Sequence, residues 1–472
     1  MDTITASSDA RGQKTGKPGL LINRDYALLF SGQTVSIIGD MLFNTTLTIW
    51  IATKLAAGQS WAPLAVSGVL LGAAVPTFLI GPLAGVFVDR ANRRRMMLAM
   101  DGLRTAVIAL MLLISGAVSL PFIPGGNLPT FWTLGVIYGV VFIVNAAEQF
   151  FRPSAMALIQ TIVPVAEQPK AVGLNQASVA LALIIGPAVA APVFVAFGAA
   201  WALLFNAASF AISYLTIYAI RTTSDAVSSG QKLQGSFLRE FLEGVRFYFS
   251  SRVLVTLLVA IIVGVSGASA LNALDVFFTT ENLGASTVMY GFIGAVYGLG
   301  AIIGSIVLAM VAGRVGLARL LWVSMTAMGL LVIVLSRLTS IAPALGFMLA
   351  IGFLNAGLNV AAGPLMMRAT PQELMGRVMS IFQPVMNLAI LVSTAIIGYL
   401  ASVTLRDFHV VWMGMSFGPI DTIWLGGGAL MALSGLVIMA GLWGVDRQAR
   451  AAAATVSLTD AIPIEECEVS AR

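Results

Sequence analysis

Twelve apolar stretches, each about 20 residues long and interrupted by Gly or Pro, run from Tyr26 to Val445 with short loops between them. A water-soluble fold would leave far too much of that surface exposed to water. The hydrocarbon core of a bilayer matches such stretches, and the helices that cross it satisfy their own backbone hydrogen bonds. The sequence therefore predicts a polytopic all-α membrane protein.

The apolar runs also give approximate bounds for the spans. We expect helices at 27–53, 62–88, 96–119, 130–150, 171–197, 201–220, 253–280, 287–312, 318–337, 341–365, 376–404 and 422–445. The longest polar interruption is 221–252, and its Thr, Ser, Asp and Gly residues are typical of a flexible linker. The linker divides the chain into two bundles of six spans, and duplicated halves with a site between them are typical of transporters.

This division predicts five regions along the chain. They are an N-terminal tail at 1–26, a six-helix bundle at 27–220, a linker at 221–252, a second six-helix bundle at 253–445 and a C-terminal tail at 446–472. The first tail lacks the apolar core of a cleaved signal peptide, so we expect the first span to direct insertion. Within the linker, apolar residues recur at helical spacing from Ser236 to Ser251. We expect an amphipathic helix at the membrane surface there, with docking of a partner protein as the alternative.

The basic residues are distributed unevenly between the two sides of the predicted topology. With both termini on one side, that side holds 22 of the 26 Lys and Arg residues, the other holds Lys54, Arg337 and Arg406, and Arg104 lies within a span. Cytoplasmic loops carry such an excess of positive charge. We therefore expect both termini in the cytoplasm, and we attribute the net charge of +5 to orientation rather than to binding of nucleic acid.

Few side chains in this sequence suit catalysis or metal binding. Cys467 is the only cysteine and lies in the predicted tail, and His409 is the only histidine and lies in a predicted outer loop. The chain has neither a Gly-Lys-Ser/Thr phosphate loop nor a nucleophile elbow where the topology could use one. We expect a protein that is not an enzyme and carries no cofactor or metal, so transport would draw on an ion gradient or on the solute's own gradient.

The loop after the second span carries the most specific motif. Its elements are Gly85, Asp89, Arg90, Arg93 and Arg94. Their spacing resembles the signature loop of the major facilitator superfamily, with Ala91 where that family's pattern usually has Gly. The resemblance implies that Asp89 lies near the start of the eleventh helix, around 375–378, and latches one conformation. The alternative is a turn that only fixes the topology.

Short motifs along the rest of the chain resemble the branch of that superfamily that contains macrolide-efflux and enterobactin-exporter-like proteins. They are Asn23-Arg24-Asp25-Tyr26, Leu29-Phe30-Ser31-Gly32-Gln33, Gly39-Asp40, Phe151-Arg152-Pro153, Glu243-Gly244-Val245-Arg246-Phe247 and Gly376-Arg377-Val378. Gly186-Pro187 in the fifth span is similar to an element of exporter-type members. The resemblance implies the major facilitator fold, with two pseudo-symmetric six-helix bundles, in a bacterial inner membrane.

Ionisable side chains within the spans are candidates for mechanism, because a charge in hydrocarbon is costly and normally faces a partner or a water-filled cavity. The candidates for proton coupling are Asp40, Glu148 and Asp275. Asp40 lies midway along the first span and is the leading hypothesis, with a permanently hydrogen-bonded structural carboxylate as the alternative. Asp275 lies in the seventh span, and its alternative is solvation near the outer surface.

Two pairs of charges are spaced for ion pairing along a helix. Asp101 and Arg104 are three residues apart in the third span, and Glu148 and Arg152 are four apart at the end of the fourth. We expect both pairs to be structural, with a direct transport role as the alternative for the first and a gating contact as the alternative for the second.

The resemblance further implies a substrate path lined by spans one, four, seven and ten. Polar and aromatic candidates at mid-depth there are Asn44, Tyr138, Asn145, Asn272, Asn355 and Asn359. Such asparagines are as often hydrogen-bond partners between helices as ligands of a substrate. The rest of the wall is mainly Phe, Leu, Met and Ile, which suits a bulky amphipathic solute better than a small, highly charged one.

These observations predict a monomeric secondary active transporter that exports a bulky amphipathic molecule, such as a drug, a macrolide-like compound or a siderophore. The expected mechanism is proton antiport by alternating access. Proton-coupled uptake of a small organic solute is the main alternative, and a non-transporting receptor or assembly factor on the same scaffold is another, since a fold alone does not set function.

Overall fold

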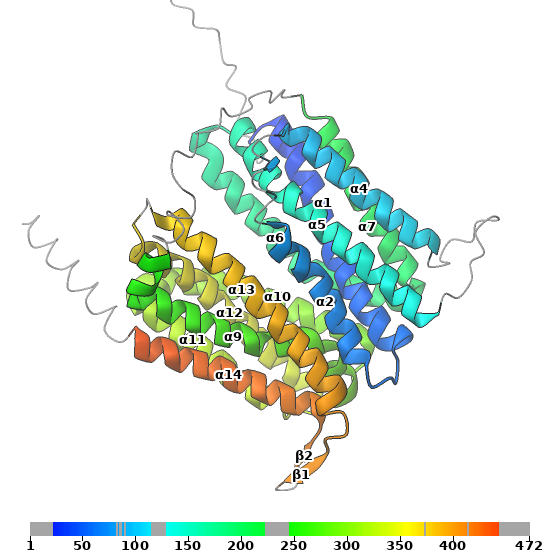
Figure 1. Ribbon diagram of the computed structural model, residues 1–472, viewed down its shortest axis with the longest axis vertical. Coiled ribbons are helices and arrows are strands. Elements are labelled where there is room, and N and C mark those ends of the chain that lie inside the picture. Colours follow the sequence, from blue (N-terminus) through cyan, green and yellow to red (C-terminus); the bar gives the residue numbers. More distant parts are fainter. Residues whose placement is uncertain are drawn as a thin grey trace, which may run out of the picture.

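The computed structural model describes residues 22–81, 84, 87–88, 91–114, 129–221, 245–371, 374–412 and 415–442. Within these ranges, twelve helices are long and apolar enough to cross a membrane. The N-terminal lobe consists of α1 (Arg24–Trp50), α2 (Ala62–Leu79), α4 (Arg93–Ile114), α5 (Thr130–Ile162), α6 (Gln168–Phe197) and α7 (Ala199–Tyr218). The C-terminal lobe consists of α9 (Arg252–Phe277), α10 (Thr287–Val315), α11 (Leu317–Leu335), α12 (Ile341–Ala369), α13 (Met375–Tyr399) and α14 (Pro419–Gly441). The fold is the predicted all-α membrane architecture of two six-helix bundles (Figure 1).

Three spans are prolonged by one π-helical turn. These turns are η1 (Ile51–Leu55) after α1, η3 (Phe278–Asn282) after α9 and η5 (Leu400–Thr404) after α13. A short 3₁₀ turn, η2 (Val165–Glu167), connects α5 to α6. Successive spans alternate in direction, so the three π turns end at one face of the molecule. We call it the far face, and we call the opposite face, where α1 begins and α14 ends, the terminal face.

Most helix ends lie within a few residues of their predicted positions, but α5 is much longer than expected. The prediction ended this span at 150, whereas α5 continues through Pro153 to Ile162. Proline in a membrane helix is tolerated because neighbouring groups satisfy the backbone that it frees. The added turns remain helical because Leu158 and Ile162 are buried in a cluster with Tyr26 of α1. The second span was predicted to reach 88; α2 ends at Leu79, and after a turn at Ile80 the described residues up to 88 are helical again.

The two lobes form separate bundles that lie side by side, with the N-terminal lobe in blue to green and the C-terminal lobe in green to red (Figure 1). They meet mainly through two pairs of helices, α6 with α10 and α2 with α13. Each pair joins a helix of one lobe to a helix of the other.

Small residues let the lobes approach closely in the half toward the far face. A Cβ atom added to Gly291, near the start of α10, would collide with the carbonyl oxygen of Pro187 in α6. In the second pair, the backbone N–H of Leu64 near the start of α2 donates to Ser402 Oγ of η5 at 2.9 Å. We call the contacts made by Leu64, Pro187, Gly291 and Ser402 the far seam.

A β-hairpin occupies the predicted outer loop before the last span. It pairs β1 (Val410–Trp412) with β2 (Met415–Phe417) in antiparallel register, and it projects from the far face (Figure 1). Arg337, between α11 and α12, pairs with Asp421 of α14 at 2.5 Å and donates to the Ser416 carbonyl at 2.6 Å. Its guanidinium also lies 4.2 Å from the centre of the Phe417 ring. Arg337 therefore ties the hairpin to the C-terminal lobe.

Several predictions fall on residues outside the described ranges. Gly85, Asp89 and Arg90 of the signature loop, most of the linker and both tails are among them. The described end of the linker is helical from Val245 to Ser250, and there Tyr248 is fully buried. This segment therefore packs part of its apolar side against the C-terminal lobe.

Candidate functional site

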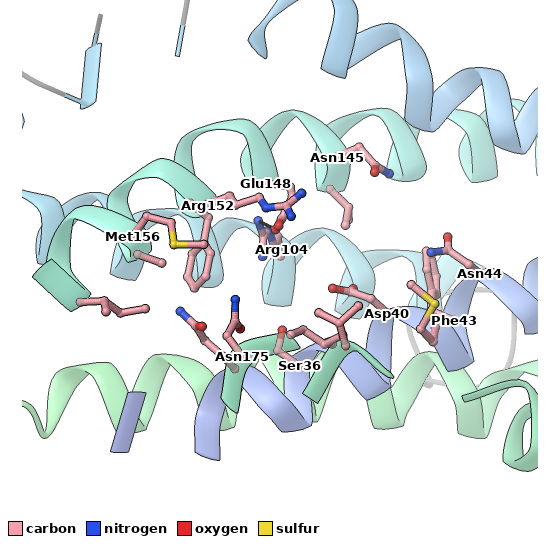
Figure 2. A pocket seen from close by; sticks show the side chains of 18 residues that line it. Ser36, Asp40, Phe43, Asn44, Arg104, Asn145, Glu148, Arg152, Met156 and Asn175 are labelled. Atoms are coloured by element: carbon pink, nitrogen blue, oxygen red, sulfur yellow. Dashed lines mark hydrogen bonds and ion pairs between the residues drawn. The ribbon is translucent and has the colours of Figure 1, made fainter. Parts of the chain in front are cut away.

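A cavity of about 290 Å³ lies inside the N-terminal lobe, between α1, α4, α5 and α6 (Figure 2). Its charged lining residues are Asp40, Arg104, Glu148 and Arg152. Its apolar wall includes Met and Phe side chains from α1 and α5. A concave site with an apolar wall and a few convergent polar groups is the usual form of a small-molecule site.

The cavity lies between the middle of the lobe and the terminal face. Its lining runs from Gln33 to Asn44 on α1 and reaches Ile159 near the end of α5. On α6 it includes Asn175, in the half of that helix that begins at the terminal face, and this side chain points across the cavity toward the helix of Glu148 and Arg152 (Figure 2). The far seam closes the opposite half of the molecule.

Arg104 of α4 is the centre of a charged network. Only 1% of this residue is exposed, and its guanidinium forms ion pairs with Asp101, at 3.6 Å, and with Glu148 of α5. The rings of Phe151 and Phe210 lie 4.8 and 5.2 Å from the guanidinium carbon. A cation held between aromatic faces and two carboxylates has the partners that burial in a membrane protein requires. The predicted pairing of Asp101 with Arg104 is present.

The predicted pairing of Glu148 with Arg152 is wrong. Glu148 pairs with Arg104, which reaches it from the adjacent helix α4, and Arg152 forms no ion pair with any residue that the structure describes. Spacing along one helix shows which side chains share a face, but it does not show which charges approach from a neighbour. Both residues also lie well inside α5, because the helix extends ten residues beyond Arg152.

Asp40 lines the cavity on the α1 side, within electrostatic range of Arg104, Glu148 and Asp101. Asn206 of α7 lies near Asp40 and is fully buried, but its side-chain Nδ2 donates no hydrogen bond to any residue that the structure describes.

Gly39 makes this approach between α1 and α7 possible, because an added Cβ would lie 2.8 Å from the Asn206 side-chain oxygen. Asn206 and Phe210 are parts of the site that the sequence interpretation missed. A polar side chain in the middle of an apolar span was the available signal for Asn206, whereas nothing in the sequence distinguished Phe210 from other core aromatics.

Of the six predicted path residues, only Asn44 and Asn145 line this cavity. The Tyr138 hydroxyl donates to the Ala65 carbonyl of α2 at 2.8 Å, and Asn355 donates to the hydroxyl of Tyr297 on α10. These two side chains hold helices together, which was the alternative prediction for such residues.

The remaining two path residues make hydrogen bonds within their own helices. The amide of Asn272 donates to the Ala268 carbonyl at 3.2 Å, and that of Asn359 donates to the Asn355 carbonyl at 3.3 Å. Both side chains are exposed on the C-terminal lobe, away from the cavity of the N-terminal lobe.

Asp275 of α9 lies apart from the cavity, toward the far face. Its Oδ1 is buried without a hydrogen-bond partner, whereas the residue as a whole is partly exposed, so the alternative prediction of a solvated carboxylate stays open. Tyr290 of α10 interacts electrostatically with Asp275. The structure thus separates the three predicted coupling carboxylates into two places, with Asp40 and Glu148 at the cavity and Asp275 near the far seam.

The two described arginines of the signature loop fasten helices at the terminal face. Arg93 donates to the Ala157 carbonyl of α5 at 3.1 Å, and Arg94 donates to the Tyr218 carbonyl of α7 at 2.6 Å. They therefore hold the start of α4 against its neighbours within the N-terminal lobe. The predicted contact of Asp89 with the start of α13 concerns a residue outside the described ranges and stays a prediction.

Comparison with solved structures supports the architecture. A bacterial homologue of the iron transporter ferroportin in an inward-facing state matches with a TM-score of 0.68 at 14% identity, covering 89% of this chain and 98% of that one. The outward-facing state of the homologue matches with a TM-score of 0.57, covering 89% of this chain and 99% of that one.

Comparison with known sequences gives the family. The chain is 22% identical to macrolide efflux protein A of Streptococcus pyogenes over 76% of its length and 85% of the relative. It is 23% identical to an uncharacterised MFS-type transporter of Bacillus subtilis (strain 168) over 83% of its length and 89% of the relative. A family model described as Major Facilitator Superfamily matches residues 29–394, which include the whole cavity. Because this match covers most of the chain, the protein belongs to the Major Facilitator Superfamily.

Proposed function

We propose that this protein is a proton-driven exporter of amphipathic organic molecules, and that Asp40 binds the coupling proton. The observation that carries the proposal is the position of Asp40, a carboxylate on the wall of a mostly apolar cavity beside the Arg104–Glu148 pair. An ionisable group at such a place in a membrane protein marks a pathway for a solute or a proton.

The arrangement of the lobes supports uptake of solute from the terminal side. The excess of Lys and Arg assigns the terminal face to the cytoplasm. On that assignment, the cavity occupies the cytoplasmic half while the far seam is closed. A solute would enter the cavity from the cytoplasm or the inner leaflet and leave after the lobes rock and the far seam opens.

Competition between the proton and the solute for Asp40 couples proton transport to solute transport. When Asp40 is ionised, it attracts a cationic group on the solute, while the apolar wall of Met and Phe side chains binds the rest of the molecule. When Asp40 is protonated, this attraction is lost and the solute is released. Proton and solute then occupy Asp40 in turn, which is antiport. The weak similarity to macrolide efflux protein A supports an amphipathic solute and the outward direction.

Transport into everted membrane vesicles tests the proposal. An exporter accumulates a fluorescent lipophilic cation, such as rhodamine 6G, when respiration acidifies the vesicle interior, whereas an importer releases it. We expect accumulation that collapses with the pH gradient, and we expect Asp40→Asn to abolish this dependence. Asn44→Ala is the matched control, because Asn44 lines the same cavity without a charge. Normal proton dependence in Asp40→Asn would exclude the coupling role.

A further inference from the structure

Arg152 of α5 is a cation on the cavity wall that has no role in the proposed function. It forms neither an ion pair nor a hydrogen bond with any residue that the structure describes. Glu148, one turn away on the same helix, is paired with Arg104 instead. A charged side chain inside a membrane span normally faces a partner or a water-filled cavity. Arg152 is thus available to bind a group that enters the cavity.

The two arginines that line the cavity differ in accessibility. Arg104 is 1% exposed and lies among two carboxylates and two aromatic rings, so its charge is already balanced. Arg152 is exposed and lines the cavity. A guanidinium presents its N–H donors in a planar fork that matches the two oxygens of a carboxylate. The accessible cation of this cavity is therefore Arg152, and its geometry suits an oxygen anion.

Two amide side chains add hydrogen-bond donors near Arg152. Gln33 of α1 lines the cavity, and its Nε2 atom is buried without a hydrogen-bond partner in the described part of the chain. Asn175 of α6 points across the cavity toward the helix that carries Arg152 (Figure 2). A buried donor without a partner is costly, and an acceptor on a bound molecule removes that cost. Three helices thus supply donors to one part of the cavity.

These donors and Asp40 lie at different depths. Gln33 precedes Asp40 by seven residues on α1, which places it about 10 Å nearer to the terminal face along the helix. Arg152 follows Glu148 by four residues on α5, which is a step of about 6 Å in the same direction. Figure 2 shows Asn175 near the Arg152 end of the cavity and Asp40 displaced toward the opposite end. The cavity therefore has a carboxylate at its inner end and a cation with two amides toward the terminal face.

We propose that Arg152, Gln33 and Asn175 form an anion-binding subsite, and that the solute is an amphipathic zwitterion. Its cationic group would bind at Asp40, and its carboxylate or sulfonate would bind at Arg152. This assignment rests on the proposed function, because it takes the cavity as the solute site, and it narrows the class of solute. A molecule with only a cationic group leaves the charge of Arg152 unpaired, whereas a zwitterion of suitable length satisfies both ends of the cavity.

Two rhodamine dyes with the same chromophore separate the two charges. Rhodamine 6G is an ethyl ester with a net positive charge, and rhodamine 19 is the corresponding free acid, whose carboxyl group is ionised at pH 7.5. Fluorescence anisotropy measures the binding of each dye to the purified full-length protein in detergent micelles, with empty micelles as the blank. Each variant is compared with the wild type for the same dye, so that the different partition of the dyes into micelles cancels.

Replacement of Arg152 should affect the two dyes in opposite directions. We expect Arg152→Gln to weaken binding of rhodamine 19 by about tenfold or more, because a hydrogen-bonded charge pair is lost. The same variant should bind rhodamine 6G more tightly, because a repelling cation is removed. Arg152→Lys keeps the charge but not the planar fork, so it should lose less affinity for rhodamine 19 than Arg152→Gln does.

Lys170→Gln is the matched control for loss of a cation. Lys170 is exposed near the start of α6, at the terminal face, and it does not line the cavity. We expect its affinities for both dyes to stay within about twofold of the wild type, since exposed charges outside a site are screened by salt. An equal change for both dyes in Arg152→Gln, or an unchanged affinity for rhodamine 19, would overturn the assignment of Arg152.

Export of rhodamine 6G by the wild-type protein in everted vesicles tests the proposed function separately. If that export is driven by the pH gradient while Arg152→Gln does not distinguish the dyes, only the anion subsite is excluded. If Arg152→Gln shows the opposite effects on the two dyes while the wild-type protein shows no proton-driven export, the subsite stands and the proposed coupling fails.

Discussion

Glu148 of α5 pairs with Arg104 of the neighbouring helix α4 and not with Arg152, which lies one turn away on its own helix. The same guanidinium lies 3.6 Å from Asp101. One buried cation thus joins two carboxylates from two helices at the wall of the cavity. Removing it would leave the fully buried Asp101 without its cation, which costs more than the ion pair itself contributes.

Replacement of Arg104 by Gln should therefore destabilise the N-terminal lobe strongly. We expect a loss of about 3–5 kcal/mol in the free energy of unfolding, because the buried Asp101 loses its cation; the partly exposed Glu148 adds little. A double-mutant cycle on Arg104 and Glu148 should give a coupling of about 0.5–3 kcal/mol, and the cycle on Arg152 and Glu148 should give almost none. Unfolding in mixed detergent micelles measures both, and a larger coupling for Arg152 would contradict the observed pairing.

Substitution of Gly291 by Ala should force the far seam apart. The added methyl group meets the backbone carbonyl of Pro187, and backbone cannot move aside as a flexible side chain can. We expect a longer distance between spin labels at Lys54 and Arg406, which are exposed at the far face on different lobes. Gly346→Ala is the matched control, because Gly346 lies inside α12 with no atom within 4 Å of its added Cβ. It should leave the distance unchanged and stabilise the helix by about 1 kcal/mol.

Loss of Arg337 should release the hairpin from the far face. Arg337→Gln removes the ion pair with Asp421 and the contact with the Phe417 ring. We expect cleavage within 410–417 by an added protease to become at least several-fold faster, with about 1–3 kcal/mol lost from the closed hairpin. The protease should cleave the Arg406→Gln variant at the wild-type rate, because the ion pair of Arg406 with Asp407 is long, at 3.9 Å, and exposed.

The Tyr248 hydroxyl should be dispensable for docking of the linker helix. Tyr248 is fully buried, its hydroxyl has no hydrogen-bond partner, and burial raises its pKa to about 12. The raised pKa means that the folded state favours the neutral hydroxyl more than the unfolded state does. The stability that comes from this difference is fully present below pH 10 and is lost as the pH rises toward 12.

We therefore expect Tyr248→Phe to raise stability at pH 7 by about 1 kcal/mol and to remove part of the loss seen at pH 11. Thermal unfolding at the two pH values measures this difference. A less stable Tyr248→Phe variant would indicate that the hydroxyl has a partner in solution.

The sequence by itself determined the class of fold, the number of spans and most of their ends. Apolar runs such as 201–220 and 318–337 match α7 and α11 within two residues, because burial in lipid is a property of a continuous segment and needs no knowledge of its neighbours. The length of α5 was not accessible in this way. Pro153 and Arg152 interrupt its apolar run, and packing against α1, α4, α6 and α7 keeps the segment beyond them helical.

The tertiary structure decided which charges meet. Periodicity places Asp101 and Arg104 on one face of α4, and it places Glu148 and Arg152 on one face of α5, but it does not say which face turns toward the other helix. Asn206 approaches Asp40 because Gly39 lets α7 come close, and Tyr290 of α10 packs against Ile49, Ala191 and Phe194 of the other lobe. These relationships join residues far apart in the chain, so they depend on helix packing, which local sequence patterns do not encode.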